Sequence, residues 1–71
     1  MALSQYAQRT IEKHGKDLAL QALSLHKQGE CADSVSWYIL PKDLQCKKQV
    51  AIDLINAGRE LMLEFLKRSK E

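Results

Sequence analysis

The sequence predicts an all-α fold: a long antiparallel helical hairpin with a short helical turn in its connection. Three observations predict it. Apolar residues recur every three or four positions in two long stretches, no stretch alternates with the period of a strand, and the only proline and only tryptophan lie between the two stretches. We expect one helix over about 4–28, a connection over 29–41 and a second helix over about 42–68. At 71 residues, the chain should form a single domain over 1–71.

The first stretch places apolar or small residues on one helical face, namely Ala7, Ile11, His14, Leu18, Ala22 and Leu25. Ser4 is suited to cap its start, because a serine side chain can accept a hydrogen bond from the first turn. Gly29 follows Lys27 and Gln28, and a basic last turn followed by glycine is typical of a helix end. We therefore expect this helix to stop just before Gly29.

The connection contains the segment SVSWYILPKDL, residues 34–44. Asp33 and Ser34 are good N-cap residues for a short helical turn, which Pro41 would interrupt. Pro41 also suits the first turn of the following helix, where its missing N–H needs no partner. Trp37 and Tyr38 have two interpretations: they close the end of the hairpin, or they form a surface that holds a partner.

The second stretch carries a broad apolar face made of Ala51, Leu54, Ile55, Gly58, Leu61, Met62 and Phe65. A glycine inside a helix costs about 1 kcal/mol relative to alanine, so Gly15 and Gly58 are unusual. In an antiparallel hairpin the two would lie opposite each other. We expect them to face each other and to let the backbones approach closely, with mere tolerance of each glycine as the alternative.

Both helices carry more apolar surface than one helix pair can bury. Leu20 and Leu23 lie off the first face, and Leu63 and Leu66 lie off the second. A core shared between copies of the chain would cover them, so we expect a homo-oligomeric helical bundle. The expected packing or interface residues are Ile11, Gly15, Leu18, Leu20, Leu23, Ala51, Leu54, Ile55, Gly58, Leu61 and Phe65.

The net charge of +2 is small and is spread along the chain, with an acidic connection and mildly basic helices. A DNA-binding module normally gathers its lysines and arginines more densely, so nucleic acid is not an expected partner. No apolar run approaches the roughly 20 residues that span a membrane, and no apolar leader is present. We expect a cytoplasmic protein with reduced thiols at Cys31 and Cys46.

Neither a metal site nor a catalytic site is expected. The possible soft metal ligands are His14, His26, Cys31 and Cys46, and no two of them have the close spacing of a zinc-binding pair. The chain lacks a G-x-S-x-G motif and a phosphate-binding glycine loop. Asp53, Glu60 and Glu64 alternate with basic residues, which is typical of a solvated helix face. We therefore predict a protein without enzymatic activity, metal or cofactor.

Basic and aromatic residues suggest a ligand. In the expected hairpin Lys13 or Lys16 lies level with Arg59, and such a cluster can hold a phosphate, although a solvated surface is the alternative. Tryptophan and tyrosine serve as interface anchors and as platforms on which bases stack. The candidate ligand-binding residues are Tyr6, Arg9, Lys13, Lys16, Trp37, Tyr38 and Arg59.

Two patterns carry a resemblance to a known family. They are I-x-x-x-G-x-x-L at Ile11, Gly15 and Leu18, and A-x-x-x-I-x-x-G-x-x-L at Ala51, Ile55, Gly58 and Leu61. With them the chain resembles the helical-hairpin phage proteins of the anti-CBASS sponge family. The resemblance implies a short, cytoplasmic, all-helical oligomer that sequesters a cyclic di- or trinucleotide used by bacteria as an immune signal.

The chain also departs from that family. The aromatic segment that precedes the first helix in the family has no counterpart, and Lys47 stands where a tryptophan is expected. No ligand-contacting residue is therefore carried over. If a nucleotide binds, stacking falls to Trp37, Tyr38 or Tyr6, and the phosphate contacts fall to nearby lysines and arginines.

The leading hypothesis is a phage-type inhibitor of bacterial immunity that sequesters a cyclic nucleotide between protomers. The alternative is a protein–protein interaction module, a small inhibitor or adaptor that binds a larger host protein. A small regulatory DNA-binding dimer ranks last, because the charge is low and no recognition helix stands out.

Overall fold

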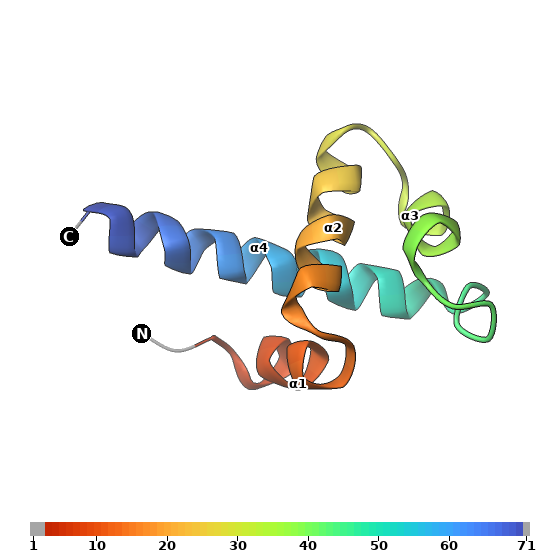
Figure 1. The fold of residues 1–71 in the computed structure, drawn as a ribbon, viewed down its shortest axis with the longest axis horizontal. Coiled ribbons are helices and arrows are strands. Elements are labelled where there is room, and N and C mark those ends of the chain that lie inside the picture. The colour runs from red at the N-terminus through yellow and green to blue at the C-terminus, as the bar shows by residue number, and fades with distance from the viewer. Residues whose placement is uncertain (1–2, 71) are drawn as a thin grey trace.

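The computed structural model describes residues 3–70, with side chains described for 3–67. Within this range the chain forms four α-helices and no strand: α1 (Gln5–His14), α2 (Lys16–Lys27), α3 (Ala32–Ile39) and α4 (Lys48–Lys70) (Figure 1). The all-α prediction is confirmed. The short helix expected in the connection is also confirmed, and it is α3.

The single helix expected over about 4–28 is wrong, because Gly15 divides it into α1 and α2. Gly15 has φ +96° and ψ +146°, a conformation that residues with a Cβ rarely adopt. Its N–H donates to the Ile11 carbonyl at 2.7 Å, and its own carbonyl accepts from the Ala19 N–H at 3.3 Å. The break directs α1 beneath α4 instead of letting it continue along α2 (Figure 1).

Ser4 caps α1, as expected, and also ties α1 to α4. Its Oγ accepts a hydrogen bond from the Ala7 N–H at 3.1 Å. The same hydroxyl donates to Glu60 Oε2 at 2.9 Å, and the Ser4 N–H donates to Glu60 Oε1 at 3.0 Å. The start of α1 is thereby held against the middle of α4.

The end of α2 confirms the role expected of Gly29. Gly29 has φ +102°, and its N–H donates to the His26 carbonyl at 3.0 Å. The Glu30 N–H donates to the Leu25 carbonyl at 3.2 Å. This pair of bonds is the Schellman motif, which closes a helix when the residue after the cap takes a left-handed conformation.

The connection differs from the expectation at both of its ends. Cys31, and not Asp33 or Ser34, is the N-cap residue of α3. Pro41 begins only one turn, in which its carbonyl accepts from the Gln45 N–H at 3.1 Å. The Gln45 carbonyl then accepts from the Oγ of Ser36 at 2.6 Å, a side chain with no exposed surface. The turn does not continue into α4, which begins at Lys48 and not near 42.

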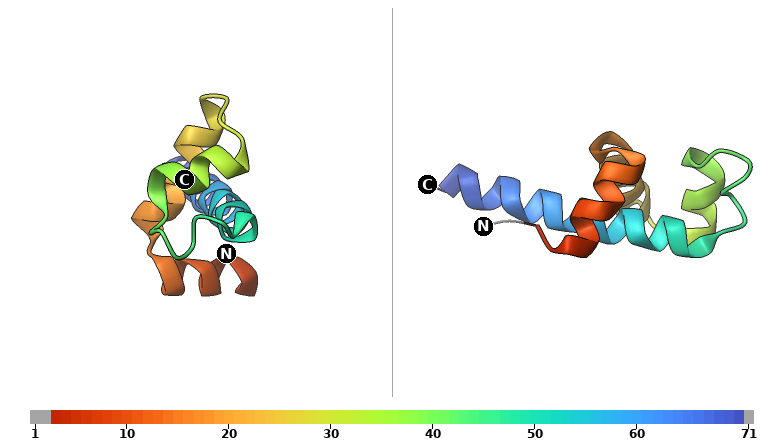
Figure 2. Two further views of the ribbon diagram at one scale, coloured as in Figure 1. Left: turned by 90° about the vertical axis from the view of Figure 1, so that its right-hand side faces the viewer. Right: turned by 90° about the horizontal axis from the view of Figure 1, so that it is seen from below.

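The second large correction concerns how the long helices meet. They do not run antiparallel beside each other: α2 crosses α4 at a steep angle, and these two helices make the most extensive contact in the molecule (Figures 1 and 2). Gly58 lies at the crossing, where an added Cβ would collide with the Ala19 carbonyl and come within 3.0 Å of the Leu23 Cβ. Gly58 does allow a close approach, but to Ala19. The expectation that it faces Gly15 is wrong, since a Cβ at Gly15 would meet nothing within 4 Å.

The core lies where α1, α2 and α3 pack on α4. Its buried apolar residues among those described are Ala7, Ala19, Ala22, Leu23, Val35, Leu40, Ala51, Leu54, Ile55 and Ala57. Many of the residues that we assigned to packing or an interface are thus covered within one chain: Leu23, Ala51, Leu54, Ile55 and Gly58 are buried, and Ile11, Leu18 and Leu61 pack against them. Leu20 is half-buried, Gly15 is exposed and Phe65 is 49% exposed.

None of the helices in the described part of the chain is long and apolar enough to cross a membrane. The molecule is elongated, with extents of 40 × 24 × 15 Å. The second half of α4 extends away from the other three helices (Figure 1).

Candidate functional site

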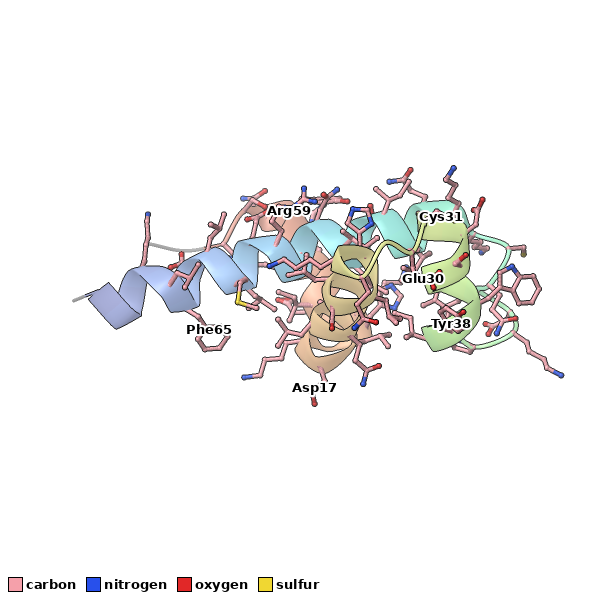
Figure 3. All side chains as sticks on the ribbon, turned by 90° about the horizontal axis from the view of Figure 1, so that it is seen from above. Asp17, Glu30, Cys31, Tyr38, Arg59 and Phe65 are labelled. Atoms are coloured by element: carbon pink, nitrogen blue, oxygen red, sulfur yellow. The ribbon has the colours of Figure 1, made fainter. Side chains whose placement is uncertain are left out.

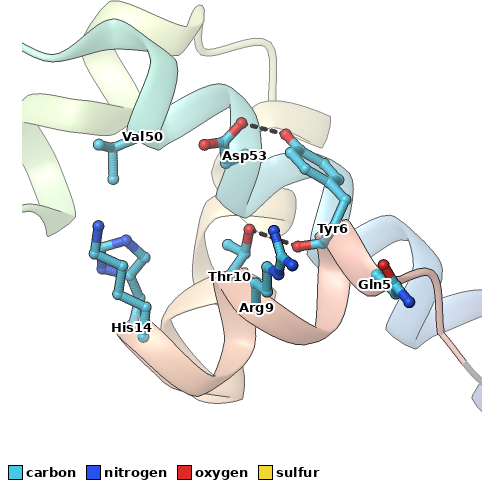
Figure 4. Close-up of a pocket in the computed structure, with 8 residues that line it drawn as sticks. Gln5, Tyr6, Arg9, Thr10, His14, Val50 and Asp53 are labelled. Carbon is cyan, nitrogen blue, oxygen red and sulfur yellow. Dashed lines mark hydrogen bonds between the residues drawn. The ribbon is translucent and has the colours of Figure 1, made fainter.

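A hollow of about 650 Å³ lies between α1 and the first half of α4 (Figure 4). It is lined by Gln5, Tyr6, Arg9, Thr10, Lys13, His14, Val50 and Asp53. The six lining residues of α1 form three adjacent pairs spaced by four positions, so they share one face of that helix. α4 supplies the opposite wall through Val50 and Asp53.

Tyr6 and Asp53 join the two walls. The Tyr6 hydroxyl donates to Asp53 Oδ1, and the side-chain amide of Gln49 donates to the same oxygen at 2.9 Å. Partial burial raises the pKa of the Tyr6 phenol above its ordinary value of 10.0, and the hydrogen bond to the Asp53 carboxylate raises it further. Tyr6 is therefore a neutral donor at physiological pH, and 44% of its surface remains exposed.

Among the lining residues, Thr10 is buried and held by a hydrogen bond, whereas Arg9 and Lys13 are exposed basic residues. Thr10 is buried, and its hydroxyl donates to the Tyr6 carbonyl at 3.0 Å, so the α1 wall carries no unpaired hydroxyl there. Arg9 and Lys13, four residues apart, are exposed, while His14 is half-buried. A guanidinium and an ammonium side by side can bind the oxygens of a phosphate, and the exposed Tyr6 ring offers a surface on which a base can stack.

The hollow brings together three of the predicted ligand-binding residues, Tyr6, Arg9 and Lys13. Lys16 and Arg59 do not line it. Lys16 is exposed at the start of α2, and the Arg59 guanidinium donates to Asn56 Oδ1 at 3.4 Å on α4. The predicted cluster of Lys13 or Lys16 with Arg59 depended on a hairpin register that the crossing of α2 and α4 abolishes.

Trp37 and Tyr38 also lie outside the hollow, on α3. Each is 65% exposed, and Figure 3 labels Tyr38 on that helix. Val35, Ser36 and Leu40 are the residues of this region that are buried. The interpretation in which the two rings close the end of the fold is therefore wrong, and they form an exposed aromatic surface.

The two thiols are exposed and free. The Cys31 Sγ lies 3.4 Å from the Ser34 Oγ, and this side-chain hydrogen bond, together with one from the Ser34 backbone, lowers the pKa of Cys31 below 9.0. Among the residues that the structure describes, no three His, Cys, Asp or Glu side chains gather in a way that could hold a metal ion.

The sequence interpretation did not assign five of the lining residues to the site: Gln5, Thr10, His14, Val50 and Asp53. Those on α1 could have been found from the sequence, because their spacing places them on the same helical face as Tyr6, Arg9 and Lys13. Asp53 had been interpreted as part of a solvated face. It is half-buried and accepts from Tyr6, and that contact depends on how α1 is placed across α4.

Comparison of the chain with protein-family models, with curated proteins and with solved structures finds no match.

Proposed function

We propose that this chain is a non-catalytic binding protein that holds a nucleotide in the hollow between α1 and α4. The observation that carries the proposal is the convergence of an exposed tyrosine ring, two basic side chains and a carboxylate on one concave surface. Small-molecule sites typically occupy about 300–1,000 Å³, and the hollow of about 650 Å³ lies within this range.

The chemistry of the rim favours a ligand with a phosphate. Arg9 offers a planar guanidinium that can donate two hydrogen bonds to one phosphate, and Lys13 offers a point charge one turn away. Both side chains are exposed, so binding a phosphate requires no loss of an existing buried contact. His14, at the same end of α1, adds a further nitrogen that can donate.

The carboxylate of Asp53 favours a particular base. Tyr6 and Gln49 both donate to Oδ1 of Asp53, so neither of these two hydrogen bonds uses Oδ2. A carboxylate accepts hydrogen bonds and repels other acceptors, so it matches guanine, whose Watson–Crick edge offers two neighbouring N–H groups. Adenine and cytosine each place an acceptor beside their amino group. We therefore propose that guanine-containing nucleotides bind best.

Cyclic di- and trinucleotides are the first ligands to test. A protein that sequesters such a signal would act as a phage-type inhibitor of bacterial immunity, which is the function implied by the sequence resemblance. The residues that line the hollow come from one chain, so the first contacts to the ligand need no second protomer.

Isothermal titration with cyclic dinucleotides and trinucleotides that contain guanine or adenine tests the proposal. We expect binding that Arg9→Ala with Lys13→Ala weakens at least tenfold. The matched control is Lys16→Ala with Lys27→Ala, which removes the same charge from exposed positions on α2, outside the hollow, and should change affinity less than twofold. Absence of heat with every nucleotide, while the chain remains folded, would falsify the proposal. An equal loss of affinity in the control pair would show that only net charge matters.

A second function is favoured by the exposed pair on α3. Trp37 and Tyr38 are each 65% exposed, and such residues are frequent anchors of protein interfaces. In this alternative the chain is a small inhibitor or adaptor of a larger host protein. Trp37→Ala should then abolish capture of that partner and leave the fold unchanged, since the indole is outside the core. Capture that survives Trp37→Ala and Tyr38→Ala together would exclude α3 as the interface.

A further inference from the structure

A single glycine separates two helices whose sequence pattern also fits one straight helix. α1 ends at His14 and α2 begins at Lys16, so Gly15 is the whole of the connection (Figure 1). Gly15 is exposed, and a Cβ built on it would meet nothing within 4 Å. The apolar face of α1 continues into α2 at helical spacing, from Ile11 to Leu18. One exposed residue therefore sets the angle between the two helices.

The bend at Gly15 interrupts the helical hydrogen bonds on both of its sides. The first bond of α2 runs from the Ala19 N–H to the Gly15 carbonyl, so the N–H groups of residues 16–18 precede it. Gly15 is the N-cap residue of α2 and has no side chain that can accept from them. The Gly15 N–H donates to the Ile11 carbonyl, so the carbonyls of residues 12–14 follow that bond. A helix that continued through Gly15 would pair these N–H groups with these carbonyls, four residues earlier.

The contact that holds α1 on α4 is small and largely exposed. The buried residues of α1 are one alanine and one threonine. At exposed positions, Ser4 donates through its N–H and its hydroxyl to Glu60. The Tyr6 hydroxyl donates to Asp53, also at an exposed position. Because water competes for exposed hydrogen bonds and little apolar surface is buried, the release of α1 costs less free energy than unfolding of the core.

We propose that α1 swings about Gly15 between the bent position of this structure and an open position in which it continues α2 as one straight helix. The bent position gains the contacts with α4, and the open position gains the hydrogen bonds across Gly15. Glycine adopts a positive φ and a helical φ without a steric clash, so this residue accepts both positions. The hollow forms only in the bent position, because α1 supplies six of its eight lining residues. A bound nucleotide would therefore select the bent position, a step that rests on the proposed function.

The distance between two spin labels tests the swing without any ligand. With Cys31 and Cys46 replaced by serine, labels at Gln8→Cys and Lys27→Cys mark α1 and the end of α2. In the straight helix the 19 positions from 8 to 27 span about 28 Å at the helical rise, and a bend shortens this distance. We expect two populations in this parent chain, a dominant one at the shorter distance and a minor one near 28 Å.

Substitution of Gly15 should move the two populations in opposite directions. Gly15→Ala disfavours φ +96° and favours a helical φ, so it should raise the ratio of straight to bent chains at least tenfold, with no loss of helical circular dichroism. A chemically made chain with D-alanine at this position favours a positive φ and should lose the straight population. Because the two enantiomers add the same atoms, a difference between them reports the torsion angle alone.

Removal of the acceptors on α4 tests the swing with Gly15 intact. Asp53→Ala with Glu60→Ala deletes the two carboxylates that hold the start of α1, and should raise the straight population at least fivefold. The matched control is Asp43→Ala with Glu64→Ala, which removes the same two charges from the turn after Pro41 and from the next helical turn of α4. The control should leave both populations unchanged.

A single shorter distance in the parent chain, in Gly15→Ala and in the Asp53→Ala, Glu60→Ala chain would overturn the swing. So would release of α1 from α4 in these variants with no population near 28 Å, because α1 would then open without joining α2. Addition of a guanine-containing cyclic dinucleotide to the parent chain should lower the straight population at least tenfold. A swing that responds to the substitutions and to no nucleotide would support the hinge and contradict the proposed function alone.

Discussion

The two halves of α4 have the same apolar spacing and opposite surroundings. From Lys48 to Gly58 the helix is covered by α1, α2 and α3, and Leu54 has no exposed surface. Beyond Leu61, which still packs against the core, the apolar side chains of α4 are more exposed, and Leu66 is 53% exposed. Periodicity therefore identifies the face that a helix would bury, whereas the elements that cover this face are determined by tertiary packing.

Truncating one leucine in each half gives the sharpest test of this difference. Leu54→Ala should lower the free energy of unfolding by about 2–5 kcal/mol, because it opens a cavity in the core. Leu66→Ala removes the same atoms on the same helix, yet in the monomer it should change stability by no more than about 0.5 kcal/mol. Urea denaturation monitored by circular dichroism measures both.

The protein concentration sharpens the comparison. If a second copy covers Leu66, the cost of Leu66→Ala should rise with protein concentration, whereas the cost of Leu54→Ala should stay the same. Equal costs for the two variants in dilute solution would mean that one chain covers Leu66.

The crossing of α2 over α4 gives the second test. Gly58→Ala adds a Cβ against the Ala19 carbonyl, and backbone cannot move aside as a side chain can. Overpacking should outweigh the gain in helix propensity and leave a net loss of about 2 kcal/mol. The neighbouring exposed Arg59→Ala is the control and should stay within about 0.5 kcal/mol. A Gly58→Ala variant that is more stable than the wild type would mean that the helices do not touch here.

The sequence predicted the elements of this fold better than their arrangement. Ser4, Gly29 and the α3 helix follow from capping and turn chemistry, which acts within a few residues. Both internal glycines were recognised as unusual, but both were assigned the same role, a close approach of two helix backbones. Gly58 provides space for α2, whereas Gly15 provides a torsion angle, and a helical pattern on both sides of a glycine does not distinguish the two. The start of α4 was predicted too early, because the chain first makes a separate turn after Pro41, whose Gln45 carbonyl accepts a hydrogen bond from Ser36, nine residues earlier.

Gly15 allows a test that separates torsion from space. The break at Gly15 lets α1 cover the first half of α4, and φ +96° is strained for an L-residue although a Cβ there would meet nothing. Gly15→Ala should cost at least about 1 kcal/mol. A chemically made chain with D-alanine at this position should keep or gain stability, because D-residues favour positive φ. Equal losses for both enantiomers in thermal unfolding would contradict a torsional role.

The candidate site was partly predictable for a similar reason. Tyr6, Arg9 and Lys13 share a helical face, so their proximity follows from sequence spacing alone. Asp53 lies 47 positions from Tyr6, and its contact exists only because α1 turns beneath α4. The sequence left open whether Trp37 and Tyr38 are buried or exposed. The structure buries Val35 and Leu40 in this region and leaves the two aromatic rings exposed.

The smallest expected effect concerns Tyr6, which connects α1 to the first, covered half of α4 through Asp53. In a Tyr38→Phe background Tyr6 is the only tyrosine, so the ultraviolet absorbance of the phenolate reports its pKa directly. Partial burial and the bond to Asp53 should place this pKa above 10.0 in the folded chain. The folded state then holds the phenolic proton more tightly than the unfolded state. The stabilising contribution is complete below pH 10.0 and is lost as the pH rises through the folded-state pKa.

Asp53→Asn is the matched change for this titration. It keeps the shape of the side chain and removes the charge that favours the protonated phenol, so the pKa of Tyr6 should move back toward 10.0 without reaching it, because burial remains the larger cause. A Tyr6 that titrates at or below 10.0 in the parent chain would mean that the ring does not bridge α1 and α4. Since the same contact forms one end of the hollow, that result would also remove the wall on which the proposed base stacks.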